Sequence, residues 1–177
     1  PTGTETALAE LKRLRPGAAV HTRGAVINDE LLLTLELTAP EIEAGRWKSG
    51  ADIQVMVSAG SGEPLTTARG RIEPGGRSPV IRVPVKGATG PFNATLRASS
   101  PAGDTAQDGV TSDRTKDLLG DPLVFRGTAP ANMRPAGSVQ FRRTERLQVR
   151  WPLNSGAERH EARLLGRDGV PLELAVT

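Results

Sequence analysis

Leucine recurs at every second position in one segment of this chain, and a period of two constrains the fold more than any other feature. The run is Leu31, Leu33, Leu35 and Leu37. Successive side chains of a β-strand point to opposite faces, so this run predicts a strand with one buried face. Thr34 and Glu36 are then expected on the opposite, open face. The pattern predicts a strand-rich chain.

Six further segments show strand patterning, and glycine, proline or Asn-Asp turn signals separate them. The expected strands are 20–26, 31–37, 53–57, 65–73, 81–85, 92–98 and 107–112. Prolines at 79 and 84 place the fifth strand at a sheet edge, because proline cannot donate to a ladder. Seven short strands at roughly ten-residue spacing predict an antiparallel sandwich of the fibronectin type III or immunoglobulin kind.

The period changes at both ends of this sandwich. Apolar residues at helical spacing in 4–14, followed by Pro16-Gly17, predict a lead-in helix within 1–17. The sandwich is expected over 18–112, a linker over 113–122, and a second, smaller β unit over 123–177. A unit of that size buries little apolar surface alone, so we expect it to pack on the sandwich or to be truncated. Truncation is favoured, because the sequence ends within a patterned strand.

Composition excludes several classes of site. The chain has no cysteine, which excludes disulfides, thiol nucleophiles and thiolate zinc sites. No apolar run approaches the roughly 20 residues that cross a bilayer, so no transmembrane segment is expected. Residues 1–117 are neutral overall, and the whole net charge of +3 falls in 118–177, where every basic residue is arginine. The preference for arginine over lysine is also typical of a GC-rich genome, so arginine content alone does not indicate a function.

The second unit resembles a stretch of the acidobacterial von Willebrand factor A-related proteins, C-terminal to their A-like domain. The motifs that carry the resemblance are GDPLVFRG at 120–127, FRRTERL at 141–147, WP at 151–152 and ARLLGRDG at 162–169. Two further motifs, EAGRWK at 43–48 and GRIEP at 70–74, look like the preceding module of those proteins. The resemblance implies an exported, multi-domain protein. The Asp-x-Ser-x-Ser metal motif of the A domain is absent, so metal-dependent adhesion is not implied.

One row of arginines is the most specific binding feature of the sequence. In a strand over 139–151, Arg142, Arg146 and Arg150 would share one face, about 13 Å apart at roughly 3.3 Å per residue. Such a row fits an acidic polysaccharide, a phosphate-bearing envelope polymer or an acidic protein. Nucleic acid is not expected there, because that face lacks stacking aromatics. The alternative is an ordinary solvated arginine face, partly offset by Glu145 and Glu161.

Other candidate sites carry weaker signals. Asp104, Asp108 and Asp113 are calcium candidates because hard cations need several carboxylates together, although their spacing matches no EF-hand loop and solvated aspartates are the alternative. His21 and His160 are too few for a zinc site without added carboxylates, and we interpret them as structural. No Gly-x-Ser-x-Gly elbow occurs, so hydrolysis is not expected.

The sequence thus predicts a non-enzymatic interaction or scaffold module of an exported bacterial protein, with no cofactor. The expected partner is a protein or an acidic envelope polymer. Two alternatives remain. One is a carbohydrate-binding module, for which Trp47 and Trp151 are the only tryptophans available. The other is an accessory β domain of an enzyme whose catalytic part lies elsewhere.

Overall fold

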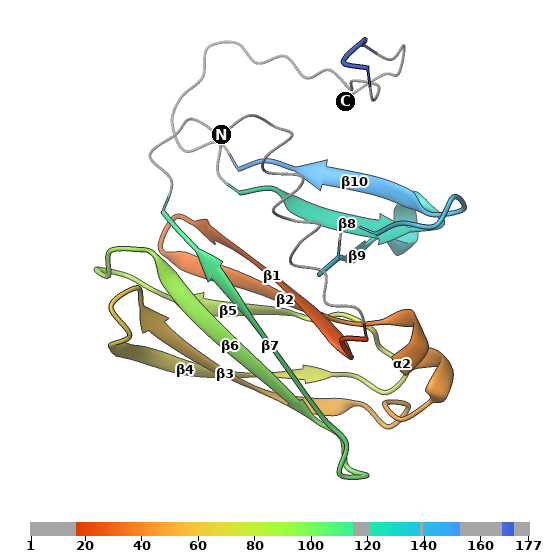
Figure 1. The fold of residues 1–177 in the computed structure, drawn as a ribbon, viewed down its shortest axis with the longest axis horizontal. Helices are drawn as coiled ribbons and strands as arrows, with labels where there is room; N and C mark the ends of the chain where they lie inside the picture. Colours follow the sequence, from red (N-terminus) through yellow and green to blue (C-terminus); the bar gives the residue numbers. More distant parts are fainter. Residues whose placement is uncertain (1–16, 115–120, 139, 153–167, 172–177) are drawn as a thin grey trace.

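The computed structural model describes residues 17–114, 121–138, 140–152 and 168–171, and it is nearly all β. Its described strands form three layers, with a short helix at one end of the sandwich (Figure 1). The predicted lead-in helix lies outside the described residues. So does most of the expected second β unit beyond residue 152, of which only 168–171 are described.

Seven antiparallel strands form the sandwich, and all seven predicted strands are confirmed. They are β1 (Val20–Ile27), β2 (Glu30–Leu37), β3 (Ala51–Ala59), β4 (Pro64–Ile72), β5 (Val80–Pro84), β6 (Phe92–Ser99) and β7 (Thr105–Ser112). One sheet has the order β1-β2-β5 and the other β4-β3-β6-β7, so β5 is an edge strand as its prolines predict. The short helix α2 (Ala39–Ala44) leads out of β2.

The core lies between these two sheets. The period-two positions Ile53, Val55 and Val57 of β3 are buried, as is Phe92 at the start of β6. Trp47, just beyond α2, joins the same apolar cluster. Because a strand buries alternate side chains, the apolar parity of each strand sets which of its faces meets the core.

The strand order distinguishes this sandwich from an immunoglobulin constant domain. Here the fourth strand pairs with the third, whereas in constant domains it joins the sheet of the first, second and fifth strands. The sheets also meet along one corner, where the backbone N–H of Thr22 in β1 donates to Asp108 Oδ2 of β7 at 2.7 Å. This hydrogen bond satisfies a donor on an edge strand that has no ladder partner on that side.

The second unit contributes a small three-stranded sheet. Its order is β10-β8-β9, with β8 (Leu123–Gly127), β9 (Arg134–Pro135) and β10 (Arg146–Arg150), and a short 3-10 turn, η1 (Pro130–Asn132), lies between β8 and β9. The prediction of one strand over 139–151 is wrong in extent. A turn at 143–144, closed by the Glu145 N–H on the Arg142 carbonyl at 2.9 Å, delays the strand to Arg146.

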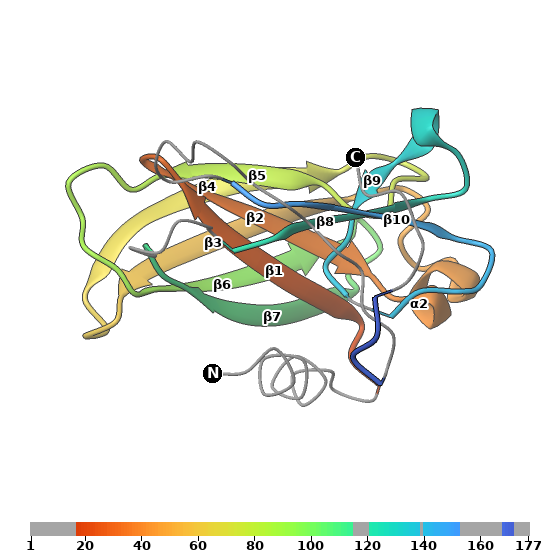
Figure 2. The same ribbon diagram turned by 90° about the horizontal axis from the view of Figure 1, so that it is seen from above.

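The small sheet lies over the outer side of β1 and β2, which becomes the middle layer (Figures 1 and 2). As a result, the polar positions of β2 are buried too: Thr34 is 9% exposed and Glu36 is 2% exposed. The expectation that this face of β2 is open is therefore wrong. None of the described strands outside the sandwich lies over the outer face of the β4-β3-β6-β7 sheet, and the alternate residues of that face remain exposed.

Candidate docking surface

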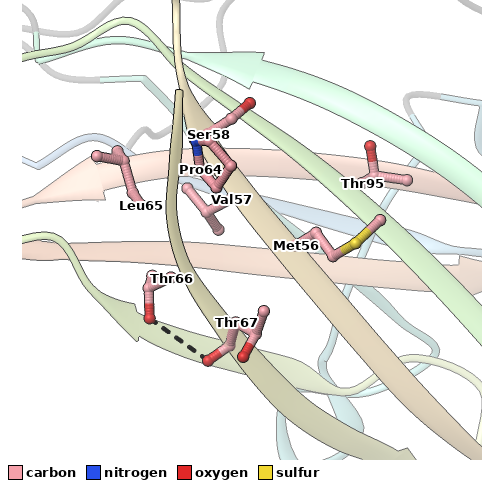
Figure 3. Close-up of a pocket in the computed structure, with 8 residues that line it drawn as sticks. All are labelled: Met56, Val57, Ser58, Pro64, Leu65, Thr66, Thr67 and Thr95. Atoms are coloured by element: carbon pink, nitrogen blue, oxygen red, sulfur yellow. Dashed lines mark hydrogen bonds between the residues drawn. The ribbon is translucent and has the colours of Figure 1, made fainter. Parts of the chain in front are cut away.

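A shallow groove crosses the outer face of the four-stranded sheet. Met56 of β3 lines it and is 61% exposed, with Thr67 of β4 and Thr95 of β6 directly opposite in register. The groove has a volume of about 580 Å³. Figure 3 shows the side chains that line it. We call it the apolar groove; it is lined by Met56, Val57, Ser58, Pro64, Leu65, Thr66, Thr67 and Thr95. An exposed methionine among methyl-bearing side chains is typical of adaptable binding surfaces.

Arginines lie beside the apolar groove on the same face. Arg69 of β4 and Arg97 of β6 are both opposite Gln54, so the three form one row across three strands. At about 4.8 Å between strands, the two arginine backbones lie about 10 Å apart. We call Arg69, Gln54 and Arg97 the basic row.

The charge of the basic row is not offset within the sheet. Arg69, Arg71 and Arg97 are exposed, and none of them forms an ion pair with any residue that the structure describes. The sole acidic side chain on this face is Asp52, which is opposite Arg71 rather than in the row. An anionic group placed over Gln54 would therefore have two guanidinium groups available to it.

The predicted arginine row on the second unit is shorter than expected. Arg146 and Arg150 share one face of β10, but Arg142 precedes the turn and its Nη2 lies 3.5 Å from Glu43 Oε1 on the sandwich. Arg150 stacks over the ring of Phe125 at 4.8 Å and donates to Gln148 at 3.2 Å. The row of three is thus wrong, because the turn at 143–144 interrupts the strand.

The aspartates proposed as calcium ligands do not meet. Asp104 precedes β7 and Asp113 follows it, which separates them by roughly 30 Å along the strand. Asp108, between them, accepts the Thr22 N–H, and Asp104 accepts a hydrogen bond from Ser100 Oγ at 3.1 Å. The calcium candidate is therefore wrong, since an extended strand keeps these carboxylates apart.

The histidines have different outcomes. His21 lies in β1 and lines a cavity of about 330 Å³ between the two units, beside Arg77 and Arg126. His160 is outside the described residues. Within the part of the chain that the structure describes, no three histidine, aspartate or glutamate side chains gather as metal ligands.

A buried charge cluster joins the second unit to the sandwich. Glu36 Oε2 accepts the backbone N–H groups of Gly137 at 2.9 Å and Ser138 at 3.1 Å. Its Oε1 lies 3.0 Å from the Nε atoms of both Arg77 and Arg126. Neither Nε–H bond points at that oxygen, so these two contacts are ion pairs without hydrogen-bond geometry.

The guanidinium of Arg126 is held from several further sides. Its Nη2 donates to the carbonyls of Ser138 at 3.1 Å and Gln140 at 2.9 Å, and its Nη1 lies 3.4 Å from Glu145. The ring of Phe141 stacks against it at 4.7 Å. The buried carboxylate of Glu36 and the buried guanidinium of Arg126 therefore both have partners, and a buried charge is tolerated only when it is paired in this way.

Sequence reasoning identified neither the basic row nor the charge cluster. Arg69, Arg71 and Arg97 stand on the polar parity of their strands, so the period of two predicts that they are exposed. The position of Arg69 and Arg97 on either side of Gln54 could not be predicted in the same way, because a single sequence does not give the register between strands. No local signal marked Glu36 as buried.

Comparison of the chain with protein-family models, with curated proteins and with solved structures finds no match. The resemblance to von Willebrand factor A-related proteins therefore stays a prediction. Among the described residues, no helix is long and apolar enough to span a membrane.

Proposed function

We propose that this chain is a non-catalytic interaction module that holds an acidic partner on the outer face of its β4-β3-β6-β7 sheet. The observation that supports this proposal best is the basic row beside the apolar groove. Arg69 and Arg97 are exposed and without ion-pair partners among the described residues, about 10 Å apart across Gln54.

Unpaired arginines on a rigid sheet suit the recognition of carboxylate or phosphate groups. A guanidinium presents a planar fork of donors that binds two oxygens together. The sheet beneath the row is fully paired on both sides of β3, so these side chains project from a well-ordered backbone. Facing an acidic partner, they would raise the rate of association as well as the affinity.

This face suits docking better than the arginines of β10. Arg150 already contacts Phe125 and Gln148, and Arg142 is not part of that strand. The outward residues of β3, β4 and β6 include no aromatic side chain. Stacking of nucleic-acid bases has no support there, and we propose a protein or an acidic polymer as the partner.

The wider setting of the module is part of the same proposal. We infer that the chain belongs to an exported bacterial multi-domain protein, and the motifs at 120–127 and 162–169 support this through their resemblance to von Willebrand factor A-related proteins. Within the described residues, the second unit packs on one sheet of the sandwich and leaves the outer face of the other sheet exposed, which suits a scaffold that presents a single face.

The test is binding to immobilised poly-L-glutamate. We expect the chain to bind, with an affinity that falls as salt screens the exposed charges. The double variant R69Q/R97Q should weaken binding by about fivefold, the effect of removing two exposed charge pairs of roughly 0.5 kcal/mol each.

A matched control changes the net charge equally on the other sheet. Arg82 of β5 and Lys86 are exposed, so R82Q/K86Q should leave binding within about twofold of the original chain. An equal loss in both double variants would mean that net charge alone drives binding. Either that result or an unchanged affinity of R69Q/R97Q would overturn the proposal.

A further inference from the structure

Resting on the proposed function, we infer that the occupant is an extended acidic segment of a partner protein. One apolar side chain of that segment sits in the apolar groove against Met56. A carboxylate two residues along the segment lies over Gln54, between Arg69 and Arg97. The inference rests on the juxtaposition of the groove and the basic row on neighbouring levels of one sheet face.

The spacing of the two features matches the repeat of an extended chain. Met56 and Gln54 are two residues apart on β3, so their levels on the sheet differ by about 7 Å. A peptide running along β3 in an extended conformation turns alternate side chains to the sheet at the same spacing. A segment with an apolar residue, then any residue, then an acidic residue would therefore place its apolar side chain in the apolar groove and its carboxylate at the basic row.

The apolar groove is what favours a peptide over an acidic polysaccharide. Its walls include Leu65 at 37% exposed and Met56 at 61% exposed, together with Pro64. A volume of about 580 Å³ accommodates a leucine or phenylalanine side chain. A polymer with charged groups alone would engage the basic row but leave this apolar surface in water, without the gain of burying it.

At the next level of the sheet, a further acidic residue of the partner would add little to the affinity. There Arg71 is opposite Asp52, so a second carboxylate at that level would meet a mixed environment. The strongest electrostatic position is the single level of Gln54. The preferred segment thus has one apolar residue and an acidic residue two positions away, with any further acidic residue adding little.

Fluorescence anisotropy with labelled synthetic peptides tests this arrangement. The first peptide carries leucine, serine and glutamate in succession within a glycine-serine chain. The second replaces its leucine by serine, and the third places leucine and glutamate side by side. We expect the first peptide to bind about tenfold more tightly than the second, because only it buries an apolar side chain. The third should also bind more weakly, since neighbouring side chains of an extended chain point to opposite faces.

Two variants link the difference to the groove. Met56 is exposed, so M56Q should fold normally and reduce the advantage of the first peptide over the second to about twofold. Val80, exposed on β5 of the other sheet, provides the matched control, and V80S should leave that advantage unchanged.

The outcomes separate this inference from the proposed function. Equal binding of the first and second peptides, with poly-L-glutamate binding still dependent on Arg69 and Arg97, would overturn the peptide inference alone. Tighter binding of dextran sulfate, insensitive to M56Q, would overturn it in favour of an acidic polymer. Loss of the arginine dependence itself would overturn the proposed function as well.

Discussion

The Nε atom of Arg126 lies 3.0 Å from Oε1 of Glu36, although one residue belongs to the second unit and the other to β2 of the sandwich. Their side chains are 8% and 2% exposed. The same carboxylate receives the N–H groups of Gly137 and Ser138, so one sandwich side chain holds two segments of the second unit. Buried charges thus hold the junction together, and removing any one partner would leave an uncompensated buried charge that destabilises it.

Replacing Glu36 should destabilise the junction severely. Glu36→Gln leaves two guanidinium groups facing a neutral amide, and we expect a loss of about 3 kcal/mol in the free energy of unfolding, measured in urea. Hydrogen exchange at the amides of Gly137 and Ser138 should accelerate, since both donate to this carboxylate. The control Glu43→Gln, 72% exposed, should change stability by less than about 0.5 kcal/mol.

A double-mutant cycle distinguishes this junction from two independent sites. Once Glu36 is neutral, Arg126→Met removes a buried charge that has lost its main acidic partner, so the double variant should be less destabilised than the sum of the single variants. We expect a coupling of about 1–3 kcal/mol. Simple additivity of the two single effects would contradict a direct contact between these side chains.

Gly137 should tolerate no side chain, because it touches the sandwich backbone. A methyl group there would collide with the carbonyl oxygen of His21 and lie 3.0 Å from Cβ of Glu36. Gly137→Ala should therefore cost on the order of 2 kcal/mol, as overpacking against a backbone does. Gly109→Ala, whose added methyl lies no nearer than 3.3 Å to Ala94, is the control. Equal unfolding midpoints for the two variants in urea would show that the units do not meet at Gly137.

The sandwich was predictable because each of its strands shows the burial pattern in its own sequence. The outer parity of β3 includes Gln54 and Met56, which the period alone assigns to the exposed face. Glu36 occupies an equivalent polar position in β2, yet it is buried, because the second unit, whose Gly137 lies 101 residues away in sequence, covers it. A period of two reports one covered face and carries no information about a second layer.

Of the binding features, the exposure of single side chains was predictable from the sequence, but their arrangement across strands was not. The exposure of Arg97 follows from its parity in β6, whereas its place across Gln54 from Arg69 depends on the register of three strands. The prediction that Arg142 shares a face with Arg146 and Arg150 is wrong for a local reason. Its parity was counted through 143–144, where the chain turns, and one irregular residue pair is enough to move a side chain off the expected face.

Arg114 should be irreplaceable by lysine. Its guanidinium donates to three backbone carbonyls, those of Asn28 at 2.7 Å, Val85 at 2.9 Å and Ala88 at 3.2 Å. It thereby fastens the chain beyond β7 to the turn between β1 and β2 and to the segment that follows β5. A lysine ammonium lacks the planar fork that reaches all three, so Arg114→Lys should lose about 2 kcal/mol of stability in urea unfolding.

The control for this substitution is Arg82→Lys, because Arg82 makes one exposed ion pair with Glu30 at 2.9 Å. A point charge serves such a pair nearly as well, and we expect a change below about 0.5 kcal/mol. A similar small effect at Arg114 would mean that its carbonyl contacts contribute through charge alone.

Glu41 should give the sandwich a stability that depends on acidity. Burial raises the pKa of Glu41, but hydrogen bonds from Trp47 and Arg46, with the charge of Arg46, outweigh it and lower the pKa below its ordinary value of 4.5. Trp47 Nε1 donates to Glu41 Oε2 at 2.8 Å. Because the pKa is lower in the folded state, this contribution is present above the unfolded pKa and is lost as pH falls through the folded value.

The measurement is urea unfolding of the chain and of Glu41→Gln at several pH values, in a Trp151→Phe background so that fluorescence reports on Trp47 alone. The original chain should be more stable than the variant at neutral pH. That advantage should shrink as the pH falls below about 4.5, because protonation gives Glu41 the same neutral character as glutamine. A difference that stays constant from about pH 7 to about pH 3 would show that the charge of Glu41 contributes nothing, and that its hydrogen bond to Trp47 alone holds the end of α2 on the core.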